Sequence, residues 1–196
     1  RPGARPAARP QPIPVPPTER PLRILMLAPE PFFEPRGTPF SEYHRIKALG
    51  ELGHHVDLVT YPVGADVALP NLRIFRSLRP PGVRKVKIGP SATKLLLDGL
   101  LTLTACRLAL TRRYDAIHSP EEAGALGVLL SKLLRLPHLY DMHSSLPQQL
   151  ANFESTRSGV VRAVFDRAER LMIGGSGGGI TLCPEPQDTP VAVWAG

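Results

Sequence analysis

The sequence has only two cysteines and no apolar run long enough to cross a membrane. Cys106 and Cys183 have no metal-ligand spacing around them, so we expect two buried thiols in a reducing compartment and no metal site. The most apolar stretch, residues 95–110, is interrupted by charged residues and falls short of the roughly 20 residues that a spanning helix requires. No apolar run follows the N-terminal charges either, so we expect no secretion signal there.

The usual glycine-rich nucleotide motifs are missing as well. Neither GxGxxG nor GxxxxGK[ST] occurs, so the sequence contains no dinucleotide-binding fingerprint and no P-loop. The glycine run at 174–179 (GGSGGG) precedes an apolar segment instead of following one, so we expect it to be a flexible connector. Zinc-finger spacing, an aromatic-rich RNA signature and a basic zipper are also absent.

The net charge of +7 is concentrated in two places. Residues 1–20 contribute four arginines against one glutamate, residues 81–113 contribute a further +6, and the rest of the chain is slightly acidic. A local basic segment and a basic tail do not form a general nucleic-acid surface, so we expect no nucleic-acid partner.

Proline is abundant, with 23 residues, and its distribution suggests the domain boundaries. Seven prolines lie within residues 1–20, which carry almost no large apolar side chains and therefore predict a disordered arm. We expect one folded domain at 21–183, and an irregular tail at 184–196.

From residue 22 onward, short apolar runs alternate with segments of helical periodicity. This alternation predicts a single α/β domain with a doubly wound, mostly parallel sheet. The expected strands are residues 22–28, 56–61, 73–78, 114–119, 138–143 and 180–183, and the later expected helices are residues 91–113, 121–136 and 156–173. In the first helix we expect Thr38 as the N-cap, Ile46, Leu49 and Leu52 facing the core, and Gly53 as the stop signal.

The loop after the first strand is the first candidate site. It contains Arg36, Gly37 and Thr38, where a glycine permits close backbone approach and a helix N-terminus offers free N–H groups to an anion. The alternative is that this segment is only a turn.

His143 is the candidate catalytic residue, at the end of an expected strand and followed by Ser144 and Ser145. We reject a Ser/His/Asp triad here, because Asp141, His143 and Ser144 are too close along one strand to converge. The alternative is a histidine that is hydrogen-bonded at a strand end. Glu121 and Glu122, at the start of an expected helix, also allow two interpretations. They either contact a substrate or only stabilise the helix through a favourable interaction of their negative charge with its dipole.

The segment from Val83 to Arg113 alternates cations with apolar residues before a leucine-rich helix. Such a pattern suits an anionic membrane surface or a lipid-linked phosphate, but it is also compatible with a core helix that has a solvated basic flank. The expected anion contacts are Arg84, Lys85, Lys87 and Lys94. A non-catalytic module that binds a membrane or a partner through this segment is the second functional hypothesis.

Three blocks together resemble the N-terminal domain of family 4 glycosyltransferases, namely residues 23–61, YDAIHSPEEAG from Tyr114, and PHLYDMHSSLPQQLANF from Pro137. The resemblance implies a GT-B fold and the acceptor-side half of a retaining, nucleotide-sugar-dependent enzyme that acts on a cell-surface or lipid-linked glycan. It implies no metal and no other cofactor.

The same resemblance assigns roles to single residues. The Gly37 loop would lie near the donor diphosphate and the acceptor, and His143 would touch the transferred sugar. Glu121, Glu122, Ser144 and Ser145 become candidate acceptor contacts. We expect a cytoplasmic location with peripheral contact at the inner face of the cell membrane. The family's donor-binding half would follow Cys183, so we expect this chain to be incomplete and negligibly active by itself.

Overall fold

The computed structural model describes residues 20–34, 37–86, 91–120, 123–142 and 178–181. The predictions of a disordered arm over residues 1–19, a helix at 156–173, a buried Cys183 and an irregular tail lie outside these residues. Of the expected arm, Arg20 is described, and its guanidinium pairs with Asp115 at 2.7 Å. Cys106 is described as a half-buried free thiol.

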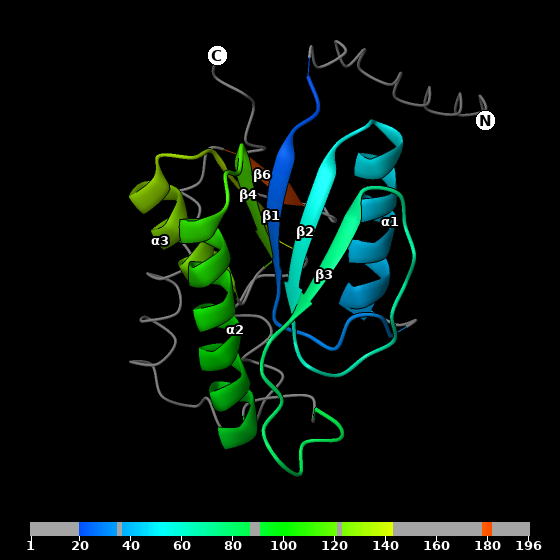
Figure 1. Cartoon of the computed structure of the whole chain (residues 1–196), viewed down its shortest axis with the longest axis vertical. Helices are drawn as coiled ribbons and strands as arrows, with labels where there is room; N and C mark the ends of the chain where they lie inside the picture. Colours follow the sequence, from blue (N-terminus) through cyan, green and yellow to red (C-terminus); the bar gives the residue numbers. More distant parts are fainter. Residues whose placement is uncertain (1–19, 35–36, 87–90, 121–122, 143–177, 182–196) are drawn as a thin grey trace, which may run out of the picture.

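Six parallel strands form one sheet in the order β3-β2-β1-β4-β5-β6 (Figure 1). The strands are β1 (Arg23–Ala28), β2 (His55–Thr60), β3 (Leu72–Arg76), β4 (Ala116–Pro120), β5 (His138–Met142) and β6 (Gly178–Thr181). Each expected strand is present within two residues of its predicted bounds, which confirms the doubly wound α/β class. The assignment of residues 174–179 to a connector is wrong in part, because Gly178 and Gly179 pair with Leu139 and Tyr140 of β5.

Helices cover both faces of the sheet, which is why β1 and β2 are apolar on both sides. Helix α1 (Gly37–Glu51) lies on one face, and α2 (Ala92–Thr111) and α3 (Gly124–Leu134) lie on the other (Figure 1). Successive residues of a strand point to opposite faces. Thus Met26 and Leu58 pack in the core that contains Ile46 of α1, while Leu25 and Val59 pack in the core that contains residues of α2.

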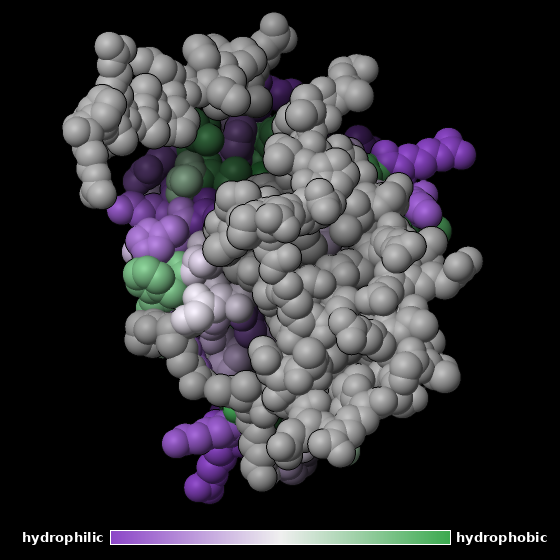
Figure 2. Space-filling view, turned by 180° about the vertical axis from the view of Figure 1, so that it is seen from behind, coloured by the Kyte–Doolittle hydropathy of each residue, from purple (hydrophilic) through white to green (hydrophobic). Residues whose placement is uncertain are grey.

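Helix α1 begins earlier than predicted, but it ends before Gly53 as predicted. Gly53 has φ +85° and donates its N–H to the Gly50 carbonyl oxygen. The helix begins at Gly37, so Thr38 is its second residue and not its N-cap. Gly37 has φ +52°, in the left-handed region that glycine adopts without a Cβ penalty, so the chain turns into the helix at this residue. The helix ends at Glu51, which leaves Leu52 in the following turn with 65% of its surface exposed instead of in the core. Seen from behind, the described surface over α1 is mostly hydrophilic (Figure 2).

Helix α2 is capped as its sequence suggests. The Ser91 hydroxyl accepts a hydrogen bond from the backbone N–H of Lys94 at 3.1 Å, which satisfies one N–H of the first turn. Leu97, Leu101, Ala105 and Leu108 recur at helical spacing and are buried against the sheet. No helix in the described part of the chain is long and apolar enough to cross a membrane.

The strand order reverses between β1 and β4. Both strands begin at the edge of the sheet from which Arg20 and Arg23 emerge, here called the amino edge, and both end at the opposite, carboxyl edge. Ligands of doubly wound sheets bind outside the carboxyl ends of the strands where the order reverses. The loop after β1 and the segment after β4 therefore flank the expected site.

Candidate functional site

The loop after β1 is held in place by contacts with the loop after β2. The Phe32 side chain is fully buried, and the guanidinium of Arg76 donates to the carbonyl oxygens of Phe32 and Val63 at 2.8 and 3.0 Å. Gly64 has φ +120°, and a Cβ there would overlap the carbonyl oxygen of Phe32. These contacts fix the path of the chain from the end of β1 toward α1.

Gly37 and Thr38 lie at the carboxyl edge, as the sequence predicted for the first βα loop. Gly37 is exposed and Thr38 is half-buried. Apart from its chain neighbours and the backbone of its own helix, no atom of the described residues lies within 4 Å of a Cβ built on Gly37. The first turn of α1 therefore presents backbone N–H groups beside open space, an arrangement that suits an anion. Arg36, the third predicted residue of this loop, lies outside the described residues.

A buried charged cluster lies on the α1 face of the sheet and contains Glu42, Arg45, His118 and Asp141. The Arg45 guanidinium forms an ion pair with Asp141 and contacts Glu42 Oε1 at 3.4 Å. His118 Nε2 lies 3.7 Å from Asp141 Oδ2. Glu42 and Asp141 are fully buried, and only Arg45 retains some exposure, so the cluster supports the carboxyl edge from below and is not open to a ligand.

Burial raises the pKa of Glu42 to about 7, although the nearby His118 and Arg45 favour its charged form. Within the described residues, Glu42 Oε2 has no hydrogen-bond partner, which agrees with a carboxyl group that is partly protonated at neutral pH. A buried carboxyl group that titrates near pH 7 beside a strand end is a common feature of functional sites, and also of structural ion-pair networks.

On the opposite face, Ser119 of β4 and His138 of β5 form a second buried polar pair. The Ser119 hydroxyl lies 2.7 Å from His138 Nε2, and burial lowers the pKa of His138 to about 4, so that the ring is neutral. Gly127 of α3 packs directly on this pair, since a Cβ there would overlap the imidazole and the Ser119 hydroxyl. This pair is enclosed by the core and therefore positions β4 against β5.

Several sequence-predicted site residues fall outside the described part of the chain. These are His143, Ser144 and Ser145 after β5, and Glu121 and Glu122 after β4. Their strands end at the carboxyl edge, because β5 ends at Met142 and β4 ends at Pro120. Their catalytic and acceptor-binding roles stay predictions.

The sequence analysis missed the cluster beneath that edge. Asp141 was considered only for the rejected triad, and Glu42 and Arg45 were not singled out. A usable signal existed: His118 and Asp141 are ionisable positions inside short strands of the sheet. Glu42 lies four residues before the core residue Ile46 on the same helix face. Polar side chains at core positions of neighbouring elements are expected to pair.

Of the predicted anion contacts near α2, Arg84 and Lys85 are exposed and Lys94 is half-buried, while Lys87 lies outside the described residues. The outer surface of α2 also exposes four leucines, which are Leu95, Leu96, Leu103 and Leu110. His54 is buried, and its Nδ1 accepts a hydrogen bond from the Leu22 N–H at 3.2 Å, so it has a structural role. Among the described residues, no group of three or more His, Cys, Asp or Glu side chains is arranged to hold a metal ion.

The strand order and the helices on both faces define a Rossmann-like α/β domain. Residues 43–189, well over half of the chain, match the family model described as glycosyl transferase 4-like domain. The chain therefore belongs to the glycosyl transferase 4-like family. A search of curated proteins finds no match.

Two solved glycosyltransferase structures resemble this fold. Sucrose-phosphate synthase from Thermosynechococcus elongatus aligns with a TM-score of 0.52 and 17% identity, over 82% of this chain and 47% of that structure. MurG from Acinetobacter baumannii aligns with a TM-score of 0.48 and 20% identity, over 87% of this chain and 44% of that structure. This chain thus spans about half the length of either structure, and at such identities the first likeness shows the fold alone.

Proposed function

We propose that this chain is the acceptor-side domain of a retaining, nucleotide-sugar-dependent glycosyltransferase that acts on a cell-surface or lipid-linked glycan. Membership of the glycosyl transferase 4-like family supports the class of reaction. The single observation that carries the placement of the site is the open space over Gly37, at the start of α1 and beside the reversal of strand order.

In this proposal the first turn of α1 stabilises negative charge on the donor diphosphate through its N–H groups and its dipole. Glycine at position 37 keeps the backbone accessible to the acceptor, which lies beside the diphosphate in this proposal. The ion pair between Arg45 and Asp141 connects α1 to β5. In this proposal it fixes the position of the helix start relative to the strand that precedes His143. His143 would contact the transferred sugar, and Glu121, Glu122, Ser144 and Ser145 would contact the acceptor.

The site is tested by NMR titration of the isotope-labelled chain with octyl glycosides as acceptor probes and with UDP- and GDP-sugars as donor probes. We expect the glycosides to shift the amide signals of Gly37, Thr38 and the ends of β1 and β4, and the nucleotide sugars to bind at least tenfold more weakly by themselves. The acceptor-side assignment is wrong if nucleotide sugars saturate this edge while no glycoside affects it. The anomeric configuration of any glycoside formed checks retention.

Two glycines supply a matched pair of variants. Gly37 and Gly53 both have positive φ, and neither would place a Cβ against another atom, but they lie at opposite ends of α1. Gly37→Ala and Gly53→Ala therefore introduce similar backbone strain. We expect only Gly37→Ala to weaken glycoside binding, by about tenfold; equal effects of the two variants would contradict the site.

The second candidate function is binding to an anionic membrane through the segment from Val83 to Arg113, which would be peripheral contact at the inner face of the cell membrane. The exposed Arg84 and Lys85, near a helix that exposes four leucines, favour it. Replacement of Arg84, Lys85 and Lys87 by Glu should abolish co-sedimentation with vesicles that contain phosphatidylglycerol. Unchanged binding by that variant would exclude this role for the segment.

A further inference from the structure

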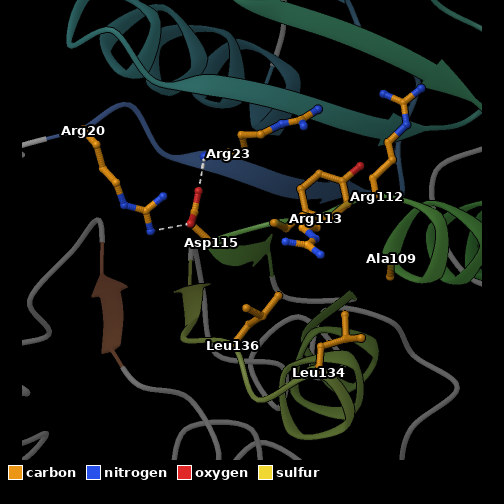
Figure 3. A pocket seen from close by; sticks show the side chains of 9 residues that line it. Arg20, Arg23, Ala109, Arg112, Arg113, Asp115, Leu134 and Leu136 are labelled. Carbon is orange, nitrogen blue, oxygen red and sulfur yellow. Dashed lines mark hydrogen bonds and ion pairs between the residues drawn. The ribbon is translucent and has the colours of Figure 1, made fainter.

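The amino edge of the sheet, opposite the proposed glycoside site, contains an open pocket of about 500 Å³ (Figure 3). It lies where α2 ends and where β1 and β4 begin. Its walls come from Arg20, Arg23, Ala109, Arg112, Arg113, Tyr114, Asp115, Leu134 and Leu136. Four arginines and one carboxylate in one pocket give it a net positive charge.

Two of these arginines make no direct side-chain contact with a carboxylate. Among the described residues, the side chains of Arg23 and Arg113 form no hydrogen bond and no ion pair at contact distance. Arg112, in contrast, contacts Asp57 at 3.2 Å and stacks on the Phe75 ring. Free guanidinium groups at a pocket wall are suited to an anion, because each can donate two parallel hydrogen bonds to one oxyanion group.

The nearby carboxylates are already engaged. Asp115 accepts hydrogen bonds from the Arg23 backbone N–H at 2.8 Å and from Arg20 at 2.7 Å, and these contacts hold its pKa below the usual value. Asp57 accepts from Tyr114 at 2.9 Å and pairs with Arg73 and Arg112. Both carboxylates are therefore engaged by other donors, and the Arg23 charge acts on Asp115 without a direct ion pair.

The remaining walls are apolar. Ala109 lies near the end of α2, and Leu134 and Leu136 follow from the end of α3. Figure 3 shows Leu134 and Leu136 on the side of the pocket that faces Arg23 and Arg112, with Arg113 between them. A ligand that fills this space would place an anionic group against the arginines and an apolar group against the leucines.

We propose that this pocket is a binding site for a phosphate monoester that bears an apolar group. Arg23 and Arg113 hold the phosphate, Arg20 borders it from the segment before β1, and Leu134 and Leu136 contact the apolar part. A dianionic phosphate matches the two guanidinium cations better than a carboxylate does. The site is distinct from the proposed glycoside site, because the two lie at opposite edges of the sheet.

Calorimetry with phenyl phosphate, inorganic phosphate and benzoate tests the soluble form of this ligand. We expect phenyl phosphate to bind at least tenfold more tightly than either of the others, and more tightly at pH 7.5 than at pH 5.5, because a phosphate monoester loses its second proton near pH 6. Equal affinity for phenyl phosphate and benzoate would overturn the proposal, as would binding that does not depend on pH.

A double variant, Arg23→Ala with Arg113→Ala, should weaken phenyl phosphate binding at least tenfold. The matched control is Lys47→Ala with Lys132→Ala, which removes the same charge from exposed positions that neither line the pocket nor belong to the segment from Val83 to Arg113. Circular dichroism checks that both variants fold. Should the pocket variant fail to fold, Arg23→Lys with Arg113→Lys is the substitute, because it keeps the positive charge but removes the planar guanidinium groups. We expect it to lower the affinity for phenyl phosphate at least threefold. Equal affinities of the pocket and control variants would contradict the site.

Vesicles distinguish a lipid headgroup from a free ester. Phosphatidic acid presents a phosphate monoester, whereas phosphatidylglycerol presents a diester, so vesicles with 10% of one or the other separate the two chemistries. Preferential binding to phosphatidic acid that the double variant loses would assign the pocket to a lipid. Binding of phenyl phosphate alone would assign it to a soluble ester. Absence of both would overturn the proposal.

Discussion

The guanidinium of Arg45 in α1 forms an ion pair with the buried carboxylate of Asp141 in β5. The two residues are far apart in the sequence. Their pair connects α1, the helix that follows β1, to β5, which is separated from β1 in the sheet by β4. His118, on the strand between them, lies 3.7 Å from the same carboxylate. One charged cluster therefore connects α1, β4 and β5 next to the carboxyl edge of the sheet.

The first prediction concerns this ion pair. Asp141→Asn should lower the free energy of unfolding by about 3 kcal/mol, because it leaves the Arg45 guanidinium in a mostly buried position without its main partner. Urea denaturation of Arg45→Met, Asp141→Asn and the double variant provides a double-mutant cycle. The two changes should be strongly non-additive.

The control is Lys47→Met on the same helix. Its partner Glu51 lies at 3.9 Å and both side chains are well exposed, so the loss should be below about 1 kcal/mol. An equally small loss for Asp141→Asn would show that the buried pair does not stabilise the edge.

The second prediction uses the raised pKa of Glu42. Its folded pKa of about 7 exceeds the ordinary value of 4.5, so the folded state binds more protons than the unfolded state between these pH values. Glu42 therefore contributes a stability that is present below pH 4.5 and lost as the pH rises through 7, by about 3 kcal/mol in total. Glu42→Gln should remove this dependence and raise the free energy of unfolding at pH 7.5 relative to the wild type. Glu51→Gln, which alters an exposed carboxylate on the same helix, should change neither the pH dependence of stability nor the free energy of unfolding at pH 7.5.

The third prediction is the opposite pH dependence of His138. Its folded pKa of about 4 lies below the ordinary 6.5, so the unfolded state binds more protons in this window, and stability falls as the pH drops from 6.5 to 4. In the wild type this loss is offset by the gain at Glu42. Urea denaturation at pH 5 and 7.5 should show a steeper acid loss in Glu42→Gln and a gain of stability toward acid in His138→Gln. Parallel slopes in the two variants would contradict both assignments.

The fourth prediction compares two helical glycines. Gly127→Ala should destabilise the domain by about 1–3 kcal/mol, because its Cβ would overlap the imidazole of His138 and lie 2.5 Å from the Ser119 hydroxyl. Gly99 lies in the middle of α2, and a Cβ added there would have no atom of the described residues within 4 Å apart from its chain neighbours and the helix backbone. Gly99→Ala should therefore stabilise the domain by about 0.5–1 kcal/mol, because alanine has a higher helix propensity than glycine. Thermal unfolding of the two variants should therefore shift in opposite directions, and a shift in the same direction would refute the packing at Gly127.

Strand positions were predictable because their signals are local. Residues 22–28 and 56–61 are apolar runs bounded by breakers, and the structure places β1 and β2 within one residue of them. Helix ends were predicted less well. Thr38 had the sequence of an N-cap but lies within α1, which begins at Gly37. Leu52 had the helical spacing of a core residue only if α1 continued past Glu51, whereas Gly53 follows the helix end as predicted.

The amino-acid sequence by itself determined the α/β class, the order of the elements and the resemblance to family 4 glycosyltransferases, because apolar periodicity and motif blocks are properties of consecutive residues. Only the tertiary structure decided that Glu42, Arg45, His118 and Asp141 share one buried cluster, and that Arg23 and Arg113 line one pocket. The strand order brings together residues that are distant along the chain, and burial then raises the pKa of Glu42. Neither effect is encoded in the spacing of any single segment.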